Sequence, residues 1–126
     1  MIQALFIQPN YVATKKLLDA TVMRHQAIAS NLANVETPSY KRVDVAQTFQ
    51  TELATAMKSE DVGRVASLRP TIDLDPKAVA ANRDGNTVKL EHELLALNQN
   101  SMAHTLETQL VSGSLLKLRL AITGRG

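Results

Sequence analysis

The stretch RHQAIASNLANVETPSYK, residues 24–41, changes at its midpoint from a helix-forming sequence to a turn-forming one. Asn34 is able to close the helix in the left-handed conformation. Pro38 forces Thr37 towards extended geometry, because the proline ring crowds the residue before it. The chain must therefore leave the helix here. We expect the ring of Tyr40 to pack back on a helix, either of its own subunit or of the next, while its hydroxyl reaches a polar partner.

Two long helices are predicted on either side of this turn. The first runs from Asn10 to about Asn34, because Asn10 can cap it and neither Gly nor Pro interrupts it. The second is predicted to begin near Asn86 or Thr87, either of which can cap it, and to stop at Gly124. The N-terminal stripe of the first helix is Leu18, Val22, His25, Ala29 and Leu32. The C-terminal stripe of the second helix is Leu95, Met102, Leu106, Leu110, Gly113, Leu116 and Leu120.

The sequence between the two helices is of mixed character. The apolar residues of VAQTFQTELATAMK, residues 45–58, recur at four-residue spacing, which predicts a short amphipathic helix. Pro70 and Pro76 interrupt the chain after it, and only RVASL (64–68) and TIDLD (71–75) alternate as strands do. We expect extended or mobile chain there.

These patterns predict a mainly α-helical fold in which the two long helices pair as an antiparallel, coiled-coil-like unit. We divide the chain into an N-terminal segment (1–40), a middle segment (41–84) and a C-terminal segment (85–126). Two helices joined by a poorly apolar middle cover only one stripe of each other, so we expect other subunits to bury the rest. A glycine inside a helix lowers its stability by about 1 kcal/mol relative to alanine. We therefore explain Gly113 by the close approach of another helix at that position.

Composition and charge argue against several classes of function. The net charge is +2 and the basic residues are scattered, so we do not expect a nucleic-acid partner. No apolar run approaches the length of a membrane span, and the opening MIQALFIQPN has no basic segment before its short apolar stretch. We therefore expect neither a membrane span nor a cleaved signal peptide.

Signals of catalysis or metal binding are weak. Glu91, His92 and Glu93 point about 100° apart on a helix and cannot converge on one ion, so we expect them on a solvated face. Asp73 and Asp75 are interpreted as turn residues, because the glycine and final glutamate of a calcium loop are missing. The chain has no cysteine, phosphate-binding loop or nucleophile motif. We predict no enzyme activity, no cofactor and no metal site.

The segment ANVETPSY, residues 33–40, resembles the signature of the axial proteins of the bacterial flagellum, the rod and hook family. In that family the N-terminal helix ends in a segment like Ala-Asn-x-x-Thr-Pro-Gly-Tyr. Asn34, Thr37, Pro38 and Tyr40 match it, whereas Ser39 stands where the family has glycine. Serine tolerates a positive φ less well than glycine does.

A second segment, DGNTVKLEHELLALNQN (residues 84–100), resembles the C-terminal segment of the proximal-rod members of this family. There, a Gly-Asn-x-Val run leads into a helix with an acidic start and a following asparagine. Met102 stands where the family has an aromatic residue. The matching positions are Gly85, Asn86, Val88, Leu90, Glu91, Glu93, Asn98, Ala121 and Ile122.

The resemblance implies a structural subunit of the proximal rod, part of a hollow drive shaft that transmits torque and through which export occurs. The implied partners are other rod subunits (copies of itself and FlgC-type subunits), the rod-base adaptor FliE, the MS ring and the export gate. The implied location is the periplasmic side of the inner membrane, reached by type III export without cleavage. The alternative is a coiled-coil adaptor or binding module of a secretion apparatus. We expect subunit interfaces at the two stripes and at Asn34, Thr37, Pro38, Tyr40 and Asn98.

Overall fold

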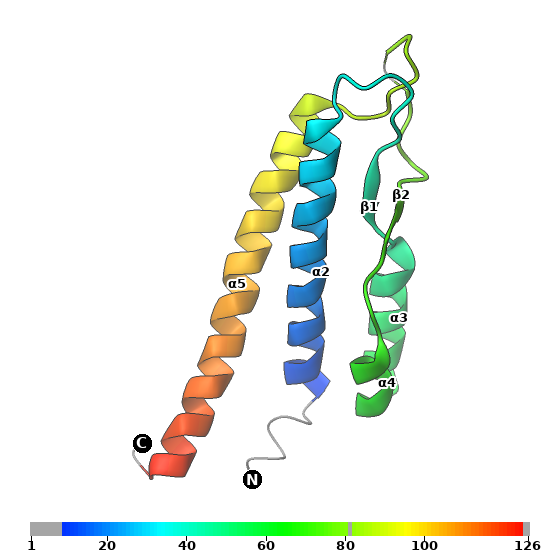
Figure 1. The fold of residues 1–126 in the computed structure, drawn as a ribbon. Coiled ribbons are helices and arrows are strands. Elements are labelled where there is room, and N and C mark those ends of the chain that lie inside the picture. Colours follow the sequence, from blue (N-terminus) through cyan, green and yellow to red (C-terminus); the bar gives the residue numbers. More distant parts are fainter. Residues whose placement is uncertain (1–8, 81, 125–126) are drawn as a thin grey trace.

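The computed structural model describes residues 9–80 and 82–124 (Figure 1). Two long helices, α2 (Pro9–Ala33) and α5 (Leu90–Thr123), lie side by side and run in opposite directions. The shorter elements contact α2 on its other side: β1 (Val43–Val45), α3 (Gln47–Lys58), α4 (Val62–Ser67) and β2 (Ile72–Leu74). The predicted mainly helical fold with an antiparallel helix pair is confirmed. Residues 1–8 of the N-terminal segment and 125–126 of the C-terminal segment lie outside the described residues.

The ends of α5 differ in how well the sequence predicted them. Gly124 ends the helix in the left-handed conformation, with φ of 65°, as expected. The start was predicted wrongly: the residue before the helix is the extended Lys89, and Leu90 is the first helical residue. Asn86 and Thr87 do not cap α5, because Nδ2 of Asn86 binds carbonyls of the turn that follows α2 and Oγ1 of Thr87 accepts from the backbone N–H of Arg42.

A small apolar core joins α2 to the middle segment. Ala13 and Ala20 of α2 meet Val45, Phe49 and Val65, together with Leu53 and Ala56. Alanine on α2 lets the shorter helices approach its backbone closely. The predicted amphipathic helix within residues 45–58 is therefore confirmed as α3.

The two alternating stretches of the middle segment, both expected to be extended, had opposite outcomes. TIDLD contains β2, which pairs antiparallel with β1 so that Asp73 lies opposite Asp44. RVASL was predicted wrongly, because most of it belongs to α4. The side chain of Asp61 accepts a hydrogen bond from the backbone N–H of Arg64 and caps this helix, and the helix buries Val65 completely.

The buried face of α2 is not the N-terminal stripe. Ala20, Ala27 and Asn31 are buried, as are Ala13, Thr21 and Ile28, whereas Val22 and His25 are exposed. Ala29 is also exposed, while Leu18 and Leu32 are half-buried. Alanine, threonine and asparagine make up most of this buried face, with Ile28 among them, so a search for large apolar residues selects a different face.

The face of α5 towards α2 carries three polar residues among half-buried apolar ones such as Leu97 and Val111. Glu93, Asn100 and Glu107 recur at seven-residue spacing on the inner side, and each interacts with a residue of α2. Every large side chain of the C-terminal stripe is exposed, from 40% for Leu120 to 67% for Met102. These large apolar side chains thus face away from their own subunit.

The last turns of α5 extend past the end of α2. Asn100 lies against Thr21, and α2 begins at Pro9, so antiparallel pairing brings the start of α2 opposite about residue 112 of α5. Among the described residues, nothing lies within 4 Å of a Cβ placed at Gly113.

Within residues 9–80 and 82–124, no helix is long and apolar enough to cross a bilayer.

Candidate functional site

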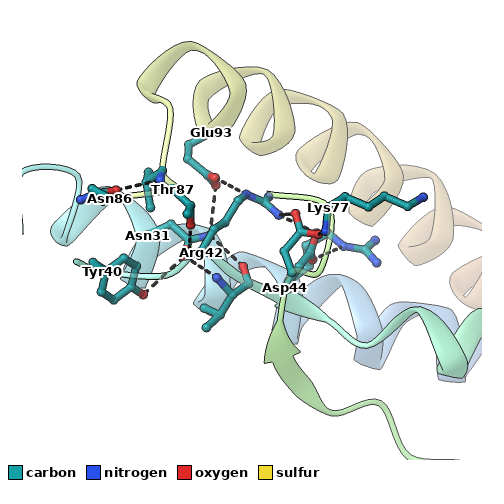
Figure 2. Close-up of polar contacts among 12 residues, drawn as sticks. Asn31, Tyr40, Arg42, Asp44, Lys77, Asn86, Thr87 and Glu93 are labelled. Atoms are coloured by element: carbon teal, nitrogen blue, oxygen red, sulfur yellow. Dashed lines mark hydrogen bonds and ion pairs between the residues drawn. The ribbon is translucent and has the colours of Figure 1, made fainter. Parts of the chain in front are cut away.

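A buried polar cluster joins the turn after α2 to the start of α5 (Figure 2). We call this cluster the junction. It draws side chains from the end of α2, the turn and β1, and also from the residue after β2, the segment before α5 and the first turn of α5. Its members are Asn31, Tyr40, Arg42, Asp44, Asp75, Asn86, Thr87 and Glu93.

Asn31 connects three elements with one fully buried side chain. Its Nδ2 donates to the carbonyl oxygen of Val43 at 2.8 Å and to Oε2 of Glu93 at 3.3 Å. Its Oδ1 accepts from the backbone N–H of Val43 at 3.0 Å and from the Tyr40 hydroxyl at 3.4 Å. Because the amide is satisfied on both sides, it fixes β1 and α5 against α2.

Tyr40 reaches polar partners, as expected, and they belong to its own chain. Its hydroxyl is 3.0 Å from Oγ of Ser30 and reaches Asn31, so the residue packs back on the helix of its own chain. The left-handed residue of the turn was predicted wrongly: it is Ser39, with φ of 62°, and not Asn34. Asn34 instead ends the helix with hydrogen bonds from its backbone N–H and its Nδ2 to the carbonyl of Ser30.

Asn86 holds the turn from the other side. Its Nδ2 lies within hydrogen-bond distance of three carbonyl oxygens of the turn, at 2.9 Å for Asn34, 3.1 Å for Val35 and 2.8 Å for Thr37. Its Oδ1 accepts from the backbone N–H of Val88 at 2.7 Å. The two segments that carry the flagellar resemblance therefore meet in space, because each supplies hydrogen-bond partners to the other.

An ion pair occupies the centre of the junction. Glu93 is fully buried, and its carboxylate accepts from Nε of Arg42. The guanidinium also reaches Asp75 at 2.9 Å and Asp44 at 3.2 Å, and Arg24 of α2 pairs with Asp44 at 3.1 Å. Burial alone would lower the pKa of Arg42, but its bond to Glu93 and the charges of Glu93 and Asp44 raise that pKa above its ordinary value.

The role of Glu93 was not predicted. We expected Glu91, His92 and Glu93 together on a solvated face, which is confirmed for the first two residues and wrong for Glu93. The seven-residue spacing of Glu93 from Asn100 was the signal in the sequence that could have placed both residues on the same face of α5. Asp75, expected to be only a turn residue, accepts a hydrogen bond from Arg42 as well as from the backbone N–H of Lys77.

The Ser39→Gly variant is expected to stabilise the isolated chain by about 1 kcal/mol, because the left-handed conformation strains a residue with a Cβ. The measurement is the midpoint of urea unfolding followed by circular dichroism. Ser101→Gly serves as the control, since Ser101 is exposed in the middle of α5 and glycine there should destabilise. An unchanged or lower midpoint for Ser39→Gly would show that the turn is not strained.

We expect Glu107 to make the pairing of α2 with α5 sensitive to pH. Burial raises the pKa of Glu107, partly opposed by a hydrogen bond from Thr21 and by the charges of His104 and Arg24. Because the pKa of Glu107 is higher in the folded chain than in the unfolded one, its stabilising contribution is fully present below the unfolded-state pKa of about 4.3. This contribution is lost as the pH rises through the folded-state pKa.

The Glu107→Gln variant is therefore expected to melt at a higher temperature than the parent chain at about pH 7, with the difference shrinking towards about pH 4. The measurement is the thermal midpoint across this range. Glu52→Gln on the exposed surface of α3 is the control. A difference that stays constant with pH would contradict the assignment.

The outer face of α5 is the second candidate site. Between Leu94 and Leu116 the ionisable residues are His104 and Glu107, and neither belongs to the C-terminal stripe. Apolar patches larger than a few hundred Å² are rare on soluble monomers and usually mark a protein–protein interface. Asn98 is exposed on the same helix. The arrangement thus suits helix-on-helix contact with another subunit.

The remaining predicted interface residues fall into two groups. Thr37 and Pro38 are exposed on the turn, as are Val22, His25 and Ala29 on α2. Asn34 and Tyr40 are engaged inside the junction of their own chain. Across the described ranges, no group of three or more His, Asp or Glu side chains is placed to hold a metal ion.

Comparison with known proteins agrees with both resemblances. No protein-family model matches the chain. The flagellar basal body rod protein FlgB of Borrelia hermsii is 32% identical, with 75% of this chain and 82% of the relative covered. The protein of that name in Aquifex aeolicus is 30% identical, with 88% and 90% covered, and that of Escherichia coli K12 is 26% identical, with 80% and 83% covered. The chain therefore belongs to the FlgB family of flagellar basal-body rod proteins.

Proposed function

We propose that this chain is a structural subunit of the flagellar basal-body rod, held in place by other rod and basal-body components. The single observation that carries the proposal is the outer face of α5, where the C-terminal stripe is exposed on the lone subunit while the inner side carries Glu93, Asn100 and Glu107. Contact with neighbours removes those side chains from water, and each Å² of apolar surface buried in this way stabilises the assembly by about 25 cal/mol. Membership in the FlgB family supports the same role.

In the finer form of the proposal, the subunit belongs to the proximal rod on the periplasmic side of the inner membrane. Copies of the chain and FlgC-type subunits surround it, and FliE, the MS ring and the export gate lie beneath. The α2–α5 pair forms part of the wall of a hollow shaft that transmits torque and through which export occurs. The chain itself arrives by type III export, unfolded and without cleavage.

The junction suits a part that carries mechanical load. Sliding α5 along α2 by one residue would move Glu93 away from Asn31 and Asn100 away from Thr21 at the same time. Arg42 and Asn86 add contacts across the same end of the pair. The helix pair therefore resists shear at the junction while its outer face remains available to neighbours.

The test is replacement of the host gene by this chain with a small tag on the α3–α4 turn, followed by isolation of basal bodies in detergent. The turn between α3 and α4 lies across α2 from α5 (Figure 1), and Glu60 in this turn is exposed. We expect swimming cells and a fixed number of tagged copies in each rod. If the tag is found only in a soluble oligomer of constant size, the chain is an adaptor and not a rod subunit.

A further inference from the structure

A groove of about 430 Å³ lies between the start of α2 and α3. We call it the α2–α3 groove. The apolar part of its lining is Ala13, Leu17, Leu53, Ala54 and Met57. Three polar residues complete the lining, and all are uncharged: Asn10, Thr14 and Gln50. A groove with this lining suits an apolar, uncharged occupant.

The α2–α3 groove continues the apolar core to the surface. Ala13 and Leu53 belong to the core, and Leu17 and Met57 are half-buried beside them. No ionisable residue lines the groove, whereas the lining of the groove between α2 and α5 includes two histidines. Apolar side chains placed in the α2–α3 groove would therefore extend the core without burying a charge.

Residues 1–8, which we call the leading segment, have the chemistry that this groove requires. The sequence is MIQALFIQ, in which five side chains are large and apolar and none is charged. It contains Phe6, one of the two phenylalanines of the chain, and the other, Phe49, is buried in the core. The leading segment lies outside the described residues and joins α2 at Pro9. Its apolar side chains gain stability when they leave water.

The leading segment is long enough to lie along the groove. Because α3 runs in the opposite direction to α2 (Figure 1), Met57 and Asn10 line the same end of the groove. Asn10 directly follows Pro9, so this end is beside the point where the leading segment begins. From Asn10 to Leu17 the groove extends about 10 Å, at about 1.5 Å per helical residue. An extended chain covers this length in about four residues.

Two other positions for the leading segment are less favourable. Continuation of α2 in a straight line is opposed by Pro9, whose ring disfavours a helical conformation in the residue before it. That path would also follow the last turns of α5, which carry Lys117 and Arg119. Binding to another copy has to compete with the groove of the same chain, to which the short connection gives an effective concentration in the millimolar range.

We propose that the leading segment folds back at Gln8 and fills the α2–α3 groove of its own chain. The apolar side chains of residues 2–7 then pack against Leu17, Leu53 and Met57. This contact covers apolar surface on the side of α2 away from α5, and it leaves the outer face of α5 to neighbouring subunits. It forms in the isolated chain, so it does not depend on the rod function.

A cysteine pair tests the contact in the full chain, whose sequence contains no cysteine. Leu5→Cys is combined with Ala54→Cys, because Ala54 lines the groove and is exposed. A disulfide requires two Cα atoms within about 7 Å of each other. Oxidation at low micromolar chain concentration is followed by non-reducing electrophoresis and mass spectrometry. We expect a disulfide within single chains.

Two further pairs make the result specific. Leu5→Cys with Glu52→Cys is the matched control, since residues 52 and 54 of α3 point about 200° apart. The groove pair should close about tenfold faster than this control. Leu5→Cys with Ser114→Cys probes the last turns of α5 instead. Equal closing rates for the groove and control pairs, faster closure of the Ser114 pair, or disulfides that join only separate copies would each overturn the proposal.

Tryptophan fluorescence tests the same contact without a covalent bond, because the chain has no tryptophan. Phe6→Trp should emit at a shorter wavelength than in the unfolded chain, since the groove removes the indole from water. Adding Ala54→Glu places a carboxylate in the groove and should return the emission to the unfolded-chain value. Adding Thr55→Glu, exposed outside the groove, should not. Solvent-like emission from the Phe6→Trp chain at normal helix content, or emission that Ala54→Glu leaves unchanged, would contradict the proposal.

Discussion

Cells that carry Leu106→Asp in place of the parent chain are expected not to swim, although the variant is made and exported at normal levels. Leu106 is 59% exposed on the isolated subunit, so the change removes little from the fold. In the rod, the aspartate would be buried between helices without a partner, and an unpaired buried charge is strongly unfavourable. Leu116→Asp should behave in the same way, because that residue is 55% exposed on the same outer face.

The measurements are spreading in soft agar and the amount of variant recovered from isolated basal bodies. Thr108→Asp is the matched control, since it places the same charge two residues away at an exposed position outside the C-terminal stripe. That control should swim. Normal swimming by the Leu106 variant would mean that the C-terminal stripe stays in water in the assembled rod.

Replacing Glu93 with Ala is expected to lower the free energy of unfolding by about 3 kcal/mol, towards the lower end of the loss seen when one member of a buried ion pair is removed. The fully buried carboxylate satisfies Arg42 and Asn31 together, so its removal leaves a guanidinium and an amide short of one acceptor each. Asp44 and Asp75 still contact Arg42, which limits the loss.

Urea unfolding followed by circular dichroism measures this effect. Glu91→Ala is the control, because Glu91 is exposed in the same first turn of α5 and has the same favourable position relative to the helix dipole. We expect the control to lose less than about 1 kcal/mol. Equal losses for the two variants would show that the junction contributes nothing beyond the charge at the helix start.

The long helices and the turn could be predicted because their signals are local. An uninterrupted run ending before Pro38 predicts α2, and Gly124 marks the end of α5. Tyr40 could be placed because the proline restricts the chain just before it. Both resemblances depended on these same terminal segments, which is why the family was recognisable.

The errors arose where distant residues decide the local structure. Asn86 is a good helix cap by type, but the carbonyls of the turn, about fifty residues earlier, compete for its amide. Glu93 looks solvated until Arg42 and Asn31 are placed beside it. Val65 sits in an alternating stretch that suggests a strand, yet its burial against α2 and α3 favours a helical turn.

Hydrogen exchange of the backbone amides of α5, compared between the isolated chain and the chain in purified rods, tests the central claim most directly. The claim is that neighbouring subunits, and not this chain, bury the outer face of α5. We predict slow exchange near the junction in both states, and fast exchange beyond about residue 112 that becomes slow only in the rod. Full protection of α5 up to Thr123 in a monomer that melts as one cooperative unit would contradict the claim.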